Sequence, residues 1–270
     1  MKSFQMKALA LAMLGLGGLV MAGAASAACT NSTPFAAWSS WNGSANVGAA
    51  FGGVTVATDG LDGTSCAMAS SFSATGKLGQ QAIVYDNSPQ KEQTYRFRFY
   101  IDPTAVAANL SSLNTVAVFG AQSASNHGTA GPTNQLAQIY LIGSGGNVFL
   151  RTWAACSTGD NQISNRCRAA SDLQLPSPFQ PNGVRVEGQV IVGSAGTSKV
   201  NLWVGSNVNA AAPDATINVD NSAWGSVGTD GVKQARLGLF QSSSSFQTAA
   251  QNKVVVFDEF DSRRQTFIGQ

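Results

Sequence analysis

The sequence predicts an all-β protein, built as a two-sheet antiparallel jelly-roll sandwich. Short extended runs rich in β-branched and aromatic residues recur along the chain, and clusters of Gly, Ser, Asn and Pro separate them. Several of these runs alternate apolar and polar residues, so each has a core-facing and a water-facing side. Many strands without long helices must close as a barrel or stack as sheets, and apolar faces on several strands favour two stacked sheets.

The first 27 residues have the layout of a secretory signal peptide. Lys2 and Lys7 lie near the start, an apolar stretch covers residues 8–22, and residues 25–27 (Ala-Ser-Ala) form a small-residue cleavage site. Residues 28–270 are expected to form a single β-sandwich domain, because no clear internal repeat or linker is visible. We expect a secreted or periplasmic protein without a membrane span, since no other stretch is long and apolar enough to cross a bilayer.

The charges of the mature chain are balanced. The full sequence has 16 basic and 14 acidic residues, and removal of Lys2 and Lys7 with the signal leaves equal numbers. A nucleic-acid partner normally requires a strong positive field. We therefore expect no nucleic-acid partner.

Four cysteines in an exported chain predict two disulfides. We expect Cys156 to pair with Cys167, because the residues between them have the composition of a loop, and Cys29 to pair with Cys66 by elimination. Lipidation of Cys29 is the alternative, since small residues precede it. That alternative would leave one of the other three thiols without a partner.

The central strand is expected at residues 94–102, where Arg96, Arg98 and Tyr100 alternate with aromatic and aliphatic residues. Residues 105–113 are expected to form a turn or two of helix. The longest loops are expected at residues 123–134 and 157–180, and turns also mark residues 205–229. The expected strands, in order, are 46–58, 67–73, 81–85, 94–101, 115–121, 136–142, 147–153, 184–192, 199–204, 232–241 and 253–261.

Outward residues of the central strands mix aromatic rings with planar hydrogen-bonding groups. If these strands share a sheet, their side chains converge on one surface, and sugar hydroxyls and the apolar face of a pyranose suit such a surface. Trp203 is expected to be exposed there. The alternative is an ordinary solvated sheet face, with Arg96 or Arg98 forming a cross-strand ion pair with Glu187. The predicted ligand-binding residues are Arg96, Arg98, Tyr100, Gln138, Tyr140, Arg185, Glu187 and Trp203, with Gln189 and Asn201 beside them.

An acidic cluster near the C-terminus is a candidate calcium site. Asp258 could supply one of the hard oxygen ligands that calcium prefers. The alternative is that these acids pair with Arg263 and Arg264. No other cofactor is expected.

Four segments resemble a known superfamily. They are residues 88–103 (SPQKEQTYRFRFYIDP), 184–190 (VRVEGQV), 200–204 (VNLWV) and 257–269 (FDEFDSRRQTFIG). They are similar to secreted bacterial proteins of the concanavalin A-like lectin/glucanase superfamily, nearest the laminin-G-like group. The resemblance implies a jelly roll with a concave sheet, carbohydrate or protein ligands, and often calcium.

These observations predict a non-catalytic protein that binds a polysaccharide or another glycan surface. A hydrolase or lyase that uses Glu187 with nearby Arg and Tyr side chains is the first alternative. The three-carboxylate motif of the glucanases is incomplete here, because Arg263 follows Glu259 and Asp261 on the same side of the last strand. An envelope or matrix structural protein is the second alternative.

Overall fold

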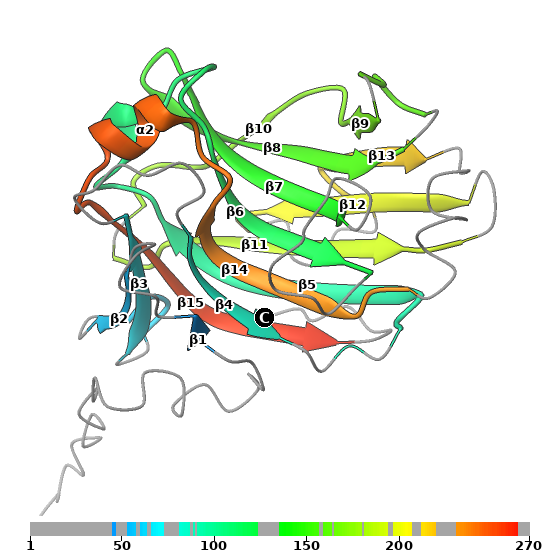
Figure 1. The fold of residues 1–270 in the computed structure, drawn as a ribbon, viewed down its shortest axis with the longest axis horizontal. Coiled ribbons are helices and arrows are strands. Elements are labelled where there is room, and N and C mark those ends of the chain that lie inside the picture. The colour runs from blue at the N-terminus through cyan, green and yellow to red at the C-terminus, as the bar shows by residue number, and fades with distance from the viewer. Residues whose placement is uncertain are drawn as a thin grey trace, which may run out of the picture.

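The computed structural model shows two stacked antiparallel β-sheets (Figure 1). This arrangement confirms the predicted all-β jelly-roll sandwich. Residues 45–46, 53–57 and 262–263 are described by their backbone alone. The structure describes residues 45–46, 53–57, 60–63, 66–72, 81–86, 89, 91–123, 135–156, 159–163, 165–179, 181–193, 197–206, 212–219 and 231–263.

Sheet A has the strand order β1-β4-β14-β6-β7-β8-β10, and β9 pairs with β8 beside that path. Neighbouring strands of this sheet all run antiparallel. Its strands are β1 (Ala45–Asn46), β4 (Ala82–Asp86), β6 (Val116–Gln122), β7 (Gln135–Ser144), β8 (Asn147–Ala155), β9 (Arg166–Arg168), β10 (Leu173–Gln174) and β14 (Gln234–Phe240).

Sheet B has the order β13-β12-β11-β5-β15-β3-β2, so β5 lies in its middle as the sequence predicts. The strands of sheet B are also antiparallel throughout. They are β2 (Gly53–Ala57), β3 (Ala67–Ser71), β5 (Thr94–Asp102), β11 (Val184–Ile191), β12 (Ser198–Val204), β13 (Ala215–Val219) and β15 (Val254–Arg263).

The core between the sheets is built on the apolar side of β5. Phe97 and Phe99 are fully buried, and the Phe97 ring stacks on Phe119 of sheet A with a centroid distance of 3.7 Å. Gly188 of β11 faces Phe97, and a Cβ atom at Gly188 would lie only 2.1 Å from that ring. The absence of a side chain at position 188 therefore makes room for the ring.

Two helical segments accompany the sheets. The 3-10 helix η1 (Ala107–Asn109) lies where a short helix is expected, whereas the helix α2 (Ser244–Ala249) is not expected from the sequence. Ser243 caps α2 by accepting a hydrogen bond from the Phe246 backbone amide at 3.2 Å. The Phe246 ring is buried and packs edge-on against Phe72, so tertiary packing stabilises a helix too short to form alone. No helix in the described ranges has the length and apolarity of a membrane span.

The structure differs from the predicted elements in three ways. The expected strand at residues 46–58 is two separate strands, β1 in sheet A and β2 in sheet B. The segment expected as a loop at residues 157–180 contains β9 and β10, and the turn-rich segment 205–229 contains β13. β9 and β10 are three and two residues long, which is too short for alternation to reveal them.

The predicted Cys156–Cys167 disulfide is confirmed, and its Cα atoms are 5.7 Å apart. Both cysteines are fully buried in the core between the sheets. Cys66 is disulfide-bonded as well. Its predicted partner Cys29, like the predicted signal peptide, lies outside the described residues.

Candidate functional site

The residues predicted to bind a ligand are divided between two sheets. β5, β11 and β12 are neighbours in sheet B, but β7 belongs to sheet A. The expectation that all of these strands share one sheet is therefore wrong for Gln138 and Tyr140. We call the outer surface of sheet B face B, formed by Arg96, Arg98, Tyr100, Arg185, Glu187, Gln189, Asn201 and Trp203.

Glu187 is the centre of an ion-pair network on face B. Its Oε1 lies 3.4 Å from Nη1 of Arg96, and its Oε2 pairs with Nη2 of Arg185. The Glu187 side chain is completely buried, and those of Arg96 and Arg185 are 14% and 4% exposed. The cross-strand ion pair that the sequence left open as an alternative is thus present, with Arg96 as the partner.

Trp203 is buried rather than exposed. Its exposed fraction is 4%, and the Arg96 guanidinium lies 5.1 Å from the centroid of its ring. The expectation of an open indole on this surface is therefore wrong, because the neighbouring arginine covers it. A ligand role for the face B residues stays a prediction.

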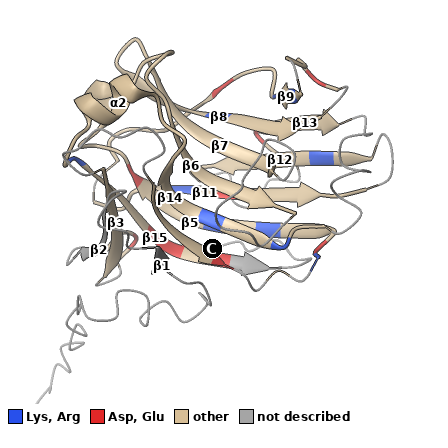
Figure 2. Cartoon of the chain, viewed as in Figure 1, with Lys and Arg blue, Asp and Glu red and all other residues tan. Residues whose placement is uncertain are grey.

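Other polar groups on face B also pair with one another. Arg98 lies 3.6 Å from Glu259 of β15, and basic residues on β5 lie beside acidic residues on β15 (Figure 2). Thr216 donates to Asn201 at 2.9 Å, and Asn201 donates to Gln189 at 3.1 Å. Much of the hydrogen-bonding capacity of face B is therefore used within the sheet.

Tyr100 offers a titration test of this face. Burial and a hydrogen bond with Asp62 raise the pKa of Tyr100 to about 12. The folded state thus holds the phenolic proton more tightly than an unfolded chain does, where the pKa is about 10. The stability that this proton contributes is complete below about pH 10 and is lost as the pH rises toward 12.

We expect Tyr100→Phe to remove the phenol that titrates near pH 12 from the ultraviolet titration of the native protein. The titration of the other three tyrosines, all of which are buried, should be unchanged. If Tyr100→Phe removed a phenol that titrates near pH 10 rather than near pH 12, Tyr100 would not be held in its buried, hydrogen-bonded position.

Asp258, the predicted calcium ligand, is a buried residue in the β15 bulge. Its carboxylate accepts hydrogen bonds from the backbone amides of Leu61 at 2.6 Å and Glu259 at 2.7 Å. The described residues contain no group of three His, Cys, Asp or Glu side chains that could hold a metal ion. Calcium binding at Asp258 stays a prediction, and the contacts seen here tie the bulge to the turn at Leu61.

The outer surface of sheet A, which we call face A, carries a row of residues in register that is interrupted only by the missing side chain of Gly120. Strand register places Tyr85 beside Arg236, Gly120 between Arg236 and Gln138, and Trp153 between Gln138 and Arg168. The row crosses six strands, from β4 to β9. Its residues are Tyr85, Arg236, Gly120, Gln138, Trp153 and Arg168, and Tyr140, Arg151 and Arg166 lie on the same face.

Face A is buried at one end and accessible at the other. Arg236 and Tyr85 are almost fully buried, with the guanidinium 5.5 Å from the centroid of the Tyr85 ring. Burial lowers the pKa of Arg236, and Tyr85 opposes that effect. Trp153, Arg166 and Arg168 are only half-buried. The part of face A that a ligand can reach therefore lies over β8 and β9.

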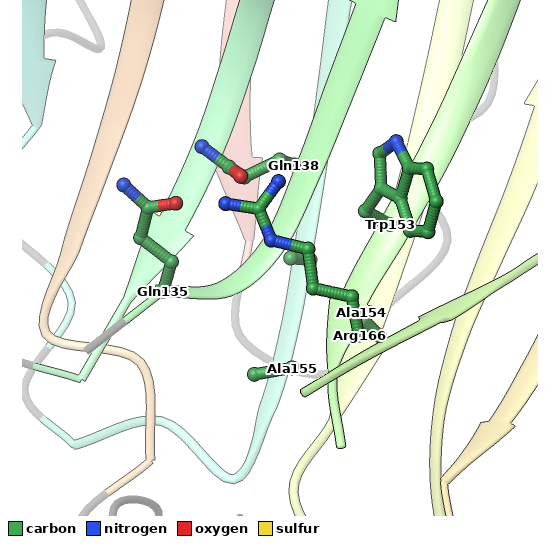
Figure 3. A pocket seen from close by; sticks show the side chains of 7 residues that line it. Gln135, Gln138, Trp153, Ala154, Ala155 and Arg166 are labelled. Carbon is green, nitrogen blue, oxygen red and sulfur yellow. The ribbon is translucent and has the colours of Figure 1, made fainter. Parts of the chain in front are cut away.

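A small pocket opens at this accessible end (Figure 3). Arg166 reaches from β9 toward Gln138, and the Trp153 indole stands beside them. The pocket has room for about one water-sized group. Its lining residues are Gln135, Ala137, Gln138, Trp153, Ala154, Ala155 and Arg166.

The amides at the pocket differ in how they are held. Gln138 donates to Oε1 of Gln241 at 2.6 Å, and the Tyr140 hydroxyl lies 2.9 Å from the same oxygen and 3.2 Å from Oε1 of Gln138. Gln135 is 5% exposed, and neither atom of its side-chain amide has a hydrogen-bond partner among the described residues. A buried amide in that state gains free energy when a ligand group supplies the missing bonds.

The positive charge near the pocket comes from the guanidinium groups of Arg166 and Arg168. Arg151, on the same face, is different, because it forms a bidentate contact with Asp172 at 2.8 and 3.0 Å. Arg166 and Arg168 have no carboxylate partner in the described part of the chain, and Arg168 lies 5.9 Å from the centroid of the Trp153 ring. Burial raises the pKa of Tyr140, while the charge of Arg166 acts against this shift. Tyr140 is therefore a neutral hydrogen-bond donor at neutral pH.

Sequence reasoning found Gln138 and Tyr140 but missed Gln135, Trp153, Arg166 and Gln241. Trp153 could have been found, because it alternates with core residues in the expected strand 147–153. Arg166 lies in a segment expected to be a loop. Gln241 follows β14 with a positive φ of 45°, a local geometry that the sequence does not reveal.

No protein-family model matches the chain, and no curated protein matches it. Among solved structures, it is similar to an endo-β-1,4-glucuronan lyase from the fungus Trichoderma reesei, with 14% identity, a TM-score of 0.47, and 79% of this chain and 87% of that chain covered. It is also similar to the alginate lyase Aly36B in complex with an alginate tetrasaccharide, with 12% identity, a TM-score of 0.49, and 74% and 81% covered. The cellulose-induced protein Cip1 matches with 14% identity, a TM-score of 0.44, and 86% and 95% covered.

Proposed function

We propose that this protein binds an anionic polysaccharide on face A without catalysing its cleavage. The observation that carries the proposal is the pocket where an amide without a partner, a guanidinium and an indole come together, namely Gln135, Arg166 and Trp153. Planar hydrogen-bonding groups suit sugar hydroxyls and carboxylates, and a half-buried indole suits the apolar side of a sugar ring.

The charges favour an anionic ligand over a neutral one. Arg166 lines the pocket and Arg168 lies beside the Trp153 ring, and the described residues place no carboxylate against either guanidinium. A guanidinium forms a planar, bidentate pair of hydrogen bonds with a carboxylate or sulfate, which a neutral hydroxyl cannot form. A sugar acid or sulfated sugar is therefore the ligand class that this pocket suits best.

The size of the pocket indicates how such a chain would bind. Because there is room for about one water-sized group, a whole sugar ring does not fit inside. The polysaccharide would lie along the surface over β8 and β9 and insert one oxygen-bearing group toward Gln135 and Gln138. Contact with a chain rather than a single sugar would supply the remaining binding energy.

Binding is favoured over hydrolysis by the residues at hand. Hydrolysis of a glycosidic bond usually requires two carboxylates on either side of that bond, and the residues that line the pocket contribute none. Glu187, the acid that sequence reasoning considered for catalysis, lies on the opposite sheet and is buried between two arginines. The predicted signal peptide and the buried disulfide support export to a compartment where polysaccharides occur.

Affinity electrophoresis and calorimetry with a polyuronate, a sulfated polysaccharide and a neutral glucan test the proposal. We expect the wild-type protein to bind one of the two anionic polymers and not the glucan, with an affinity that falls as salt is added. Arg166→Ala should weaken binding by about tenfold or more, since one charged hydrogen-bonding group is lost.

Lys199→Ala is the matched control, because it removes one positive charge from face B. It should bind like the wild-type protein. Equal losses for Lys199→Ala and Arg166→Ala would show that net charge, not the face A pocket, governs binding. Failure of the wild-type protein to bind any anionic polymer would overturn the proposed function.

A further inference from the structure

We infer that the Cys156–Cys167 disulfide is a positioning element of the face A site, which holds β9 so that Arg166 and Arg168 stand beside the pocket. The inference rests on the proposed function, because the positions of these two guanidinium groups matter only if face A binds a ligand. It concerns residues that no ligand would touch.

The two arginines flank the cysteine directly in the sequence of β9. Strand register places Arg166 opposite Ala155, Cys167 opposite Ala154 and Arg168 opposite Trp153. Since side chains alternate across a strand, Cys167 points into the core while its two neighbours point to face A. When the sulfur atom of Cys167 is fixed in the core, the directions in which the Arg166 and Arg168 side chains leave the backbone toward face A are fixed as well.

β9 is short, and apart from its pairing with β8 it is held by the loop before it. It has three residues and lies beside the main path of sheet A. The loop adds backbone hydrogen bonds from Cys156 to Asn165 at 3.1 Å, from Arg168 to Asp160 at 3.0 Å, and between Ile163 and Arg166 at 2.8 and 3.1 Å. The side chain of Asn161 also donates to the Arg168 carbonyl at 3.1 Å. A strand this short at the edge of a sheet opens readily unless something anchors it.

The disulfide supplies that anchor at a well-packed point. Both cysteines are fully buried, and Cys156 immediately follows β8. A Cβ atom at Gly159 would lie 2.8 Å from Sγ of Cys167, so the loop packs directly on the disulfide. The covalent bond joins the end of β8, which carries Trp153, to the middle of β9, which carries both arginines.

Positioning matters here because arginine side chains lose much freedom when they bind. A backbone that already holds the guanidinium beside the pocket lowers the entropy cost of binding. Without the disulfide, β9 can leave β8 and carry Arg166 away from Gln135 and Gln138. The contribution of Arg166 to binding should then largely disappear, although the residue itself is still present.

A double-mutant cycle tests the inference on the full chain, with the anionic polymer that the wild-type protein binds best as the probe. The four proteins are the wild type, Arg166→Ala, the double variant Cys156→Ala/Cys167→Ala, and the triple variant. We expect Arg166→Ala to weaken binding by about tenfold when the disulfide is present and by less than about twofold when it is absent. Equal effects in both backgrounds would overturn the inference.

Hydrogen exchange of the unliganded double variant gives a readout that does not depend on binding. Exchange should become faster in peptides that cover residues 156–168 and stay unchanged in those that cover β5 and β11. Unchanged exchange in β9 would also overturn the inference. No binding by the wild-type protein to any anionic polymer would overturn the proposed function, and the inference with it.

Asp160→Ala provides a second variant that keeps the disulfide, in case the cysteine variant does not fold. The Asp160 carboxylate accepts hydrogen bonds from the backbone and side-chain nitrogens of Asn218 at 2.8 and 3.0 Å and thereby ties the loop to β13. If the disulfide is the anchor, Asp160→Ala should bind within about twofold of the wild type. A loss as large as that of Arg166→Ala would show that the loop contact positions β9, which contradicts the inference.

Discussion

Replacement of Glu187 by glutamine is expected to lower the free energy of unfolding by about 3–5 kcal/mol, the usual cost of breaking a buried ion pair. The side chain is fully buried and pairs with both Arg96 and Arg185. Glutamine keeps the shape of the side chain but removes its negative charge. Two guanidinium groups that are 14% and 4% exposed would then lie side by side without that carboxylate.

Urea unfolding at neutral pH measures this loss, and Glu259→Gln is the matched control. Glu259 also pairs with an arginine of β5, but its side chain is 41% exposed and the distance to Arg98 is 3.6 Å. Because water screens such a pair, the control should cost about 1 kcal/mol or less. Similar losses for the two variants would show that the network around Glu187 is not buried as the structure describes.

Replacement of Phe97 by alanine should lower the free energy of unfolding by about 3–5 kcal/mol. The ring has an exposed fraction of 1%, stacks on Phe119 across the sandwich at 3.7 Å, and lies against Gly188 within its own sheet. The space that the ring would leave lies between the β11 backbone at Gly188 and the Phe119 ring of the opposite sheet. The structure therefore cannot close that cavity easily.

Phe97→Leu is the companion variant, because leucine keeps much of the apolar volume and should cost clearly less than alanine. Urea unfolding of both variants gives the comparison. Equal and small losses would mean that the core between the sheets is looser than the stacked rings of Phe97 and Phe119 indicate.

The sequence determines the fold class largely through alternation. In β5, aromatic and aliphatic side chains fall on one side and Arg96, Arg98 and Tyr100 on the other, which predicts a half-buried strand in the middle of a sheet. The Cys156–Cys167 disulfide follows from a short loop between two cysteines. β13 was missed, although Ile217 and Val219 face the core, because turn residues surround it.

The distribution of strands between the sheets could not be predicted in the same way. Alternation shows which side of a strand faces the core, but a strand in either sheet has such a side. Gln138 and Tyr140 were therefore placed correctly as outward residues of β7 but on the wrong sheet. Their neighbours across the sheet, such as Arg236 and Trp153, are set by register over long sequence separations.

The pocket itself depends on features that a local pattern does not contain. Arg166 belongs to it because a three-residue strand turns back onto β8, and Gln135 because a register shift lies between β6 and β7 near that residue. The residue types on face B suit a sugar as well as those at the face A pocket do. On face B, however, the side chains pair mostly with one another. Only the structure shows which polar groups are paired in this way.

The most direct test of binding at face A is a nuclear magnetic resonance titration with a short oligosaccharide of the anionic polymer. The indole N–H signals of Trp153 and Trp203, assigned with Trp153→Phe and Trp203→Phe variants, report on the two faces separately. Binding at face A predicts that the Trp153 signal and the side-chain amide signals of Gln135 shift, while the Trp203 signal stays in place. A shift of the Trp203 signal with Trp153 unchanged would place the ligand on face B and contradict the proposed site.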